Sequence, residues 1–102
     1  MTRLRHSSQA RADLLEIWLG IAADHPTAAD RTLDRLEQRL RILIDWPLAG
    51  AACPRISAEA RILVEHPYVI LYRLIPEAVQ IVRFLHGARD IDAALFGEGL
   101  EE

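Results

Sequence analysis

Hydrophobic and polar positions follow two different periods along this chain, and the period changes near Arg61. Before this point, apolar residues recur every three or four positions, as on one face of an α-helix. After it, short runs rich in β-branched and aromatic residues are separated by breaks that contain proline, as in strands joined by tight turns. The pattern predicts a helical half followed by a half made of β-strands.

The helical half reads as two helices joined by a short break at His25–Pro26. Ser7 and Ser8 are good N-cap residues for a first helix, and Pro26 suits the first turn of a second helix that ends at Trp46. A joint this short predicts an antiparallel helical hairpin. The apolar stripes of the two helices contain Leu14, Ile17, Trp18 and Ile21, then Leu33, Leu36, Leu40, Leu43 and Ile44.

The strands are predicted at residues 2–6, 61–66, 68–74 and 79–85. A loop is expected at 46–57, where Trp46 is predicted to pack against the residues that follow it. The breaks between the last three strands are short enough for hairpins, so these strands form an antiparallel meander. The order β-αα-βββ predicts an α+β fold, with the helical hairpin packed on one face of an antiparallel sheet. The other face would then be polar or covered by a partner.

Composition and charge narrow the class of protein. The 102 residues are 51% hydrophobic and 26% charged, which fits a single globular domain over 1–102, with 91–102 expected as a flexible tail. No apolar run is long enough to span a bilayer, the N-terminus lacks the apolar core of a signal peptide, and Cys53 is the one cysteine. A cytoplasmic protein without membrane contact is therefore expected.

The net charge of −3 is concentrated in the tail, because residues 90–102 contain five acidic residues and no arginine. The rest of the chain is nearly balanced, which argues against direct DNA binding. The sequence contains no lysine, so every fixed cation is an arginine. No glycine-rich phosphate loop, C-x-x-C or H-E-x-x-H motif occurs, and the four histidines are scattered. Neither a metal site nor a cofactor is expected.

One group of residues has the chemistry for catalysis. Arg61, Arg83 and His86 lie on predicted neighbouring strands, where the histidine could move protons and the arginines could hold phosphate, as in RNA cleavage. The alternative, which we favour, is that these arginines, together with Arg73 on the middle strand, line the rim of the sheet and pair with Glu59, Glu65 and Glu77.

The segment L-H-G-A-R-D, residues 85–90, has a structural explanation that we favour over catalysis. Gly87 permits a turn after the last strand, and Arg89 and Asp90 could anchor the departing chain. The aromatic residues leave two alternatives open. Tyr68 and Tyr72 are core residues if their sheet face meets the helices, and a partner surface if that face is free. Trp18 lies on the apolar face of the first helix, where core packing is expected.

Four segments together resemble one protein family, and the resemblance covers nearly the whole chain. They are A-R-A-D-L-L-E-I-W, W-P-L-A-G at the end of the second helix, R-I-L-V-E-H-P-Y-V-I-L-Y-R, and V-R-F-L-H-G-A-R-D. In this order they resemble the ParE toxins of the RelE/ParE superfamily, from bacterial type II toxin–antitoxin systems. The fold of that family, β-αα-βββ, agrees with the order predicted from the periods.

The resemblance implies a toxin that inhibits DNA gyrase without being an enzyme. It also implies a ParD-like antitoxin whose flexible C-terminal part wraps around the helical hairpin and sheet. The residues expected to contact this antitoxin are Leu14, Trp18, Leu33, Leu36, Leu40, Tyr68 and Tyr72. The residues expected to contact the target, or to form a structural motif, are Arg83, His86, Arg89 and Asp90.

Two alternatives stay open. A RelE-like, ribosome-dependent mRNA endonuclease would use His86, Arg83 and Arg61 as catalytic residues. The absence of lysine, and of any tyrosine after Tyr72, departs from the RelE pattern and favours the ParE reading. A degenerate toxin that only binds its antitoxin is the other alternative.

Overall fold

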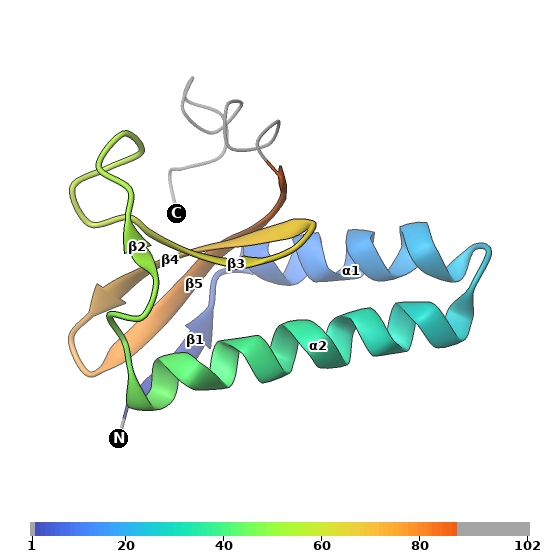
Figure 1. The fold of residues 1–102 in the computed structure, drawn as a ribbon, viewed down its shortest axis with the longest axis horizontal. Helices are drawn as coiled ribbons and strands as arrows, with labels where there is room; N and C mark the ends of the chain where they lie inside the picture. The colour runs from blue at the N-terminus through green and yellow to red at the C-terminus, as the bar shows by residue number, and fades with distance from the viewer. Residues whose placement is uncertain (1, 88–102) are drawn as a thin grey trace.

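The structure is a computed structural model that describes residues 2–87, and it places a helical hairpin on one face of a five-stranded sheet (Figure 1). Its elements are β1 (Arg3–His6), α1 (Ser8–Ala22), α2 (Pro26–Asp45), β2 (Ala51–Ala52), β3 (Arg61–Glu65), β4 (Tyr68–Ile75) and β5 (Ala78–His86). The predicted α+β fold and the order of its main elements are confirmed. The predicted tail at 91–102 lies outside the described residues.

The sheet has the strand order β1-β5-β4-β3-β2, and it is mixed rather than wholly antiparallel. The meander of β3, β4 and β5 is antiparallel as predicted, but β1 pairs with β5 in parallel, with Arg3 opposite Ala78. Periodicity identifies a segment as a strand without indicating the direction of its neighbour, so this pairing could not be predicted. The two-residue β2 lies inside the segment predicted as a loop.

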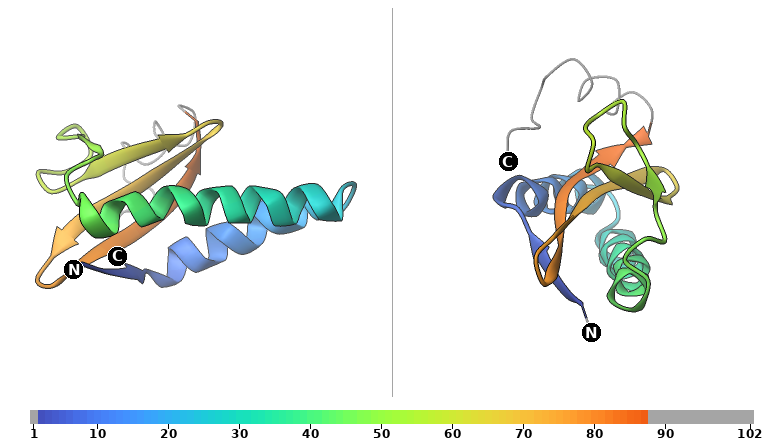
Figure 2. Two further views of the ribbon diagram at one scale, coloured as in Figure 1. Left: turned by 60° about the horizontal axis from the view of Figure 1, so that its bottom comes forward. Right: turned by 90° about the vertical axis from the view of Figure 1, so that its left-hand side faces the viewer.

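Both helices begin where the sequence predicts. Ser7 caps α1, since its Oγ accepts a hydrogen bond from the Ala10 amide at 2.9 Å and donates to the Val82 carbonyl at 2.7 Å. The second bond also fixes the start of α1 against β5. Figure 2 shows the hairpin extending beyond the ends of the strands, so the joint between the helices projects from the body of the domain. No helix within residues 2–87 has the length and apolar character needed to cross a membrane.

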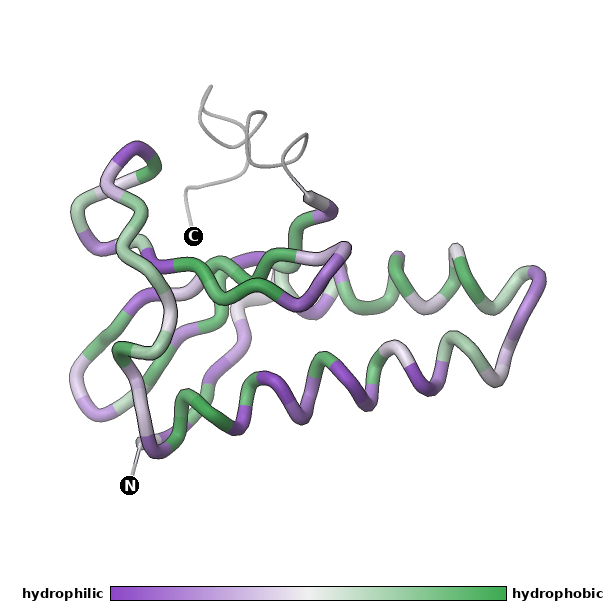
Figure 3. Tube along the Cα trace, in the orientation of Figure 1, coloured by the Kyte–Doolittle hydropathy of each residue, from purple (hydrophilic) through white to green (hydrophobic). Residues whose placement is uncertain are grey.

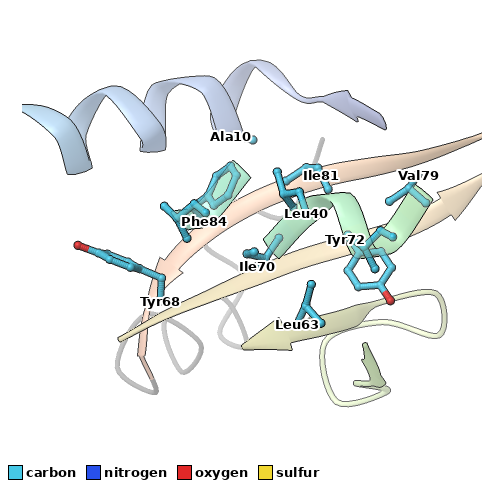
Figure 4. Packing of buried hydrophobic residues seen from close by; sticks show 11 residues of the cluster. Ala10, Leu40, Leu63, Tyr68, Ile70, Tyr72, Val79, Ile81 and Phe84 are labelled. Atoms are coloured by element: carbon cyan, nitrogen blue, oxygen red, sulfur yellow. The ribbon is translucent and has the colours of Figure 1, made fainter. Parts of the chain in front are cut away.

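The main core lies between the hairpin and the sheet (Figure 4). Tyr68, Ile70 and Tyr72 point to this face, as their alternation predicts, whereas Leu74 at the end of β4 is 40% exposed. The core cluster consists of Ala10, Leu36, Leu40, Leu43, Leu63, Tyr68, Ile70, Tyr72, Val79, Ile81 and Phe84. Figure 3 shows that hydrophilic and hydrophobic positions alternate more sharply in α2 than in α1.

The opposite face of the sheet is apolar, not polar, and the chain itself contributes to its cover. Val69, Leu71, Val82 and Leu85 form a second buried cluster with Ala60. Cys53, Ile56 and Ile62 pack against this cluster, so residues before and within β3 help to close it. Trp46 does not pack against its loop as expected, because it is 68% exposed.

Candidate partner-binding groove between the helices

An open groove of about 460 Å³ lies between α1, α2 and the sheet. In Figures 1 and 2 the helices separate from their joint toward β1. Leu36, Leu40 and Phe84 are buried and form its floor, while Leu14 and Leu33 are half-buried at its sides. The remaining lining residues are His6, Asp30, Asp34 and Glu37. The site is thus an apolar trough with carboxylates along one side.

Some of the residues that the sequence predicts as antitoxin contacts are accessible in the structure, and others are buried. Leu14 and Leu33 line the groove and remain accessible. Trp18 is half-buried beside it, and its Nε1 donates to Asp30 Oδ1 at 2.9 Å, which links the two helices. Leu36 and Leu40 reach the groove only as its buried floor.

Tyr68 and Tyr72 face the helices and belong to the core, so they do not form a surface for a partner. They are 8% and 0% exposed, respectively. The Tyr72 hydroxyl accepts a hydrogen bond from the Gly50 amide and donates one to the Pro47 carbonyl, both at 2.8 Å. A Cβ atom at Gly50 would lie 2.6 Å from the Tyr72 ring, so the glycine of W-P-L-A-G is a steric requirement.

His6 is the one histidine in the groove lining, and it is half-buried. Its ring stacks on Phe84 with centroids 6.1 Å apart. Burial, and secondarily the positive charge of Arg11, lowers the pKa of His6, while Glu37 acts in the opposite direction. The imidazole is therefore neutral near pH 7, and it does not offset the carboxylates of the groove.

Arg61 is held away from the other predicted catalytic candidates. Its guanidinium donates to the carbonyls of Leu48 and Gly50, at 3.1 and 2.7 Å, and so secures the loop before β2. Arg83 lies on β5, which β4 separates from the strand of Arg61. Its Nε donates to Asp13 Oδ2 on α1 at 2.8 Å. The rim pairings expected with glutamates hold for Arg73 and Glu59, at 3.7 Å, but not for these two arginines.

Arg83 and His86 do share a surface cavity of about 280 Å³, together with Asp13 and Glu16. His86 is exposed, and its ring packs nearly perpendicular to the Tyr68 ring, with centroids 5.3 Å apart. Gly87 has a φ of +67°, which fits the predicted turn after the last strand. Arg89 and Asp90 lie outside the described residues. Among residues 2–87, no three His, Cys, Asp or Glu side chains are grouped so that they could hold a metal ion.

Asp13 is an important residue that the sequence analysis missed. β1 ends at His6, and within residues 2–87 no strand lies beside this edge of β5 after this point. There Asp13 Oδ2 accepts hydrogen bonds from the Phe84 amide at 3.0 Å and from Arg83 Nε at 2.8 Å. The carboxylate thus satisfies the backbone of β5 after its neighbouring strand has ended. The signal in the sequence is an acidic residue on the apolar stripe of α1, between Ala10 and Ile17.

Comparison with protein-family models matches residues 4–91 to the family described as "ParE toxin of type II toxin-antitoxin system, parDE". The chain belongs to the ParE toxin family. A curated relative, "Putative toxin Y4kP" of Sinorhizobium fredii (strain NBRC 101917 / NGR234), is 32% identical over 84 residues, which are 82% of this chain and 86% of the relative.

A solved structure shares the fold of this ParE-family toxin. It is described as "Chromosomal ParDE TA system from P. aeruginosa", and it superimposes with a TM-score of 0.75 at 23% identity, covering 85% of this chain and 97% of the other. The sequence-based assignment to the ParE toxins of the RelE/ParE superfamily is thereby confirmed, and the protein is a toxin of the type II toxin–antitoxin class.

Proposed function

We propose that this ParE-family toxin inhibits DNA gyrase by binding it, and that a ParD-like antitoxin neutralises it by occupying the groove between α1 and α2. The groove is the observation that carries the proposal. Its floor of Leu36, Leu40 and Phe84, with Leu14 and Leu33 at the sides, offers an apolar surface of the kind that receives an amphipathic helix. A cytoplasmic location, where gyrase acts, is part of the proposal.

The contacts of the three candidate catalytic residues support binding over RNA cleavage. A phosphate-binding arginine must direct its donors toward the substrate. The Arg61 guanidinium donates to backbone carbonyls, and Arg83 donates twice to Asp13, at 2.8 and 3.2 Å. Arg61 thus lies away from His86, and the Arg83 donors that bind Asp13 are not directed toward a substrate.

The test uses purified toxin, released from its antitoxin, in two parallel assays. The first is gyrase supercoiling of plasmid DNA, and the second is ribosomal translation of a defined mRNA. We expect inhibited supercoiling or trapped cleavage complexes, with the mRNA intact. Codon-spaced cuts in the mRNA with unaffected gyrase would instead establish the endonuclease alternative. Activity in neither assay would support a degenerate toxin that only binds its antitoxin.

A further inference from the structure

Most charges of α2 are separated onto two sides of the helix. Arg31, Arg35 and Arg39 recur every four residues and form one stripe. Asp30, Asp34 and Glu37 recur at spacings of four and three and form another. Arg41, four residues after Glu37, follows the acidic side but is not among the residues that line the groove. The two stripes meet different parts of the domain.

The arginine stripe is directed toward the edge of the sheet at β3. Arg35 Nε lies 3.0 Å from Glu65 Oε2, and Arg39 Nε donates to the Val64 carbonyl at 3.0 Å. Two of the three arginines of the stripe thus attach α2 to β3. They are held on the side of α2 away from the groove lining.

The acidic stripe lines the groove without cationic partners. Within residues 2–87, neither Asp30, Asp34 nor Glu37 has an ion pair within 4.0 Å, although Asp30 accepts the bond from Trp18. Among residues 2–87 no arginine lines the groove, and the chain has no lysine. Carboxylates beside an apolar floor produce a local negative potential that attracts cationic groups and repels anionic ones.

We infer that the groove selects an amphipathic helix with lysine or arginine along the flank that faces α2, whose cations pair with Asp34 and Glu37 while its apolar side covers the floor. The inference rests on the proposed function, because the helix would be the antitoxin segment that occupies this groove. Charge complementarity of this kind contributes mainly to specificity, since it disfavours partners with acidic flanks.

The test compares two synthetic amphipathic helices of about 15 residues, a length at which helix formation is feasible. They have the same leucine face, and their flanks carry lysine in one and glutamate in the other. Titration calorimetry with the full-length toxin measures both affinities. We expect the lysine peptide to bind about tenfold more tightly than the glutamate peptide, with an advantage that decreases as salt is added.

Two variants with the same change in net charge locate the effect. The double variant Asp34→Asn, Glu37→Gln should reduce the preference to about twofold or less. The control Asp24→Asn, Asp45→Asn changes exposed carboxylates outside the groove lining and should leave the preference unchanged. Equal affinities, binding of neither peptide, or a preference that survives the groove variant would overturn the inference.

The outcome is separate from that of the gyrase assay, which uses free toxin and no groove ligand. A toxin that prefers the lysine peptide but leaves gyrase unaffected would contradict the proposed target alone. A toxin that inhibits gyrase but binds both peptides equally would contradict the charge selectivity alone.

Discussion

Gly50 and Tyr72 together fix the segment that follows α2. Replacing Gly50 with alanine would place a Cβ 2.5 Å from the Ile62 carbonyl and 2.6 Å from the Tyr72 ring. Because backbone and a buried ring cannot easily move, Gly50→Ala should lower the free energy of unfolding by about 1–3 kcal/mol. Gly20, where a Cβ would meet nothing within 4 Å, provides the control. Urea denaturation compares both variants with the wild type. Gly20→Ala, in the interior of α1, should be at least as stable as the wild type. A Gly50→Ala variant as stable as the wild type would contradict the close packing.

Asp13 should be among the most costly residues to replace. Removing its carboxylate leaves Arg83 and the buried Phe84 amide without this partner, so Asp13→Ala should cost about 3 kcal/mol. Glu16→Ala, an exposed neighbour on α1, should change stability by less than about 0.5 kcal/mol. Denaturant titration measures both variants, and a loss below about 1 kcal/mol for Asp13→Ala would contradict the structural role.

His6 should make stability depend on pH. Its folded-state pKa is lowered from 6.5, mainly by burial, so the folded protein binds this proton less readily than the unfolded chain does. The contribution is complete above pH 6.5 and is lost as the pH falls through that value toward the folded-state pKa. Unfolding of the wild type and His6→Gln, about one unit above and below 6.5, should show the larger acid loss in the wild type. Equal losses would contradict the burial of His6.

At the scale of elements, α2 is attached to the sheet through one of its polar sides. Arg39→Ala removes the hydrogen bond to the Val64 carbonyl and should cost about 1 kcal/mol. Arg31→Ala removes the same charge from an exposed position of the same stripe and should cost less than about 0.5 kcal/mol. Thermal unfolding compares the two, and equal losses would indicate that the bond to β3 contributes little.

The elements could be predicted because their signals are local. The Ser7 cap, Pro26, and the alternation through Tyr68, Ile70 and Tyr72 each depend on residues close in sequence. The parallel pairing of β1 with β5 and the role of Asp13 join segments about 70 residues apart, and no local pattern contains such contacts. The sequence predicts which side of α2 is polar. It does not predict which polar residues face the sheet and which face the groove, because that depends on where β3 lies.

At the scale of the whole molecule, one side of the hairpin is joined to the sheet and the other opens as a groove. Of the predicted antitoxin contacts, Leu14 and Leu33 are accessible in this groove, whereas Tyr68 and Tyr72 are buried in the core. The sequence pattern also did not predict that Leu15 and Leu19 would be exposed on α1, where they are 59% and 54% exposed. Whether an apolar helical residue is covered depends on the tilt of its helix over the sheet, which periodicity does not determine.

The most direct test of the account is bacterial growth on expression of the toxin, with and without its antitoxin. The decisive variant is Leu33→Gln in the groove, and Leu15→Gln on the exposed face of α1 is the matched control. We expect all three toxins to stop growth alone, and the antitoxin to rescue cells with the wild type and Leu15→Gln but not Leu33→Gln. Full rescue of Leu33→Gln, or normal growth with the wild-type toxin alone, would contradict the account.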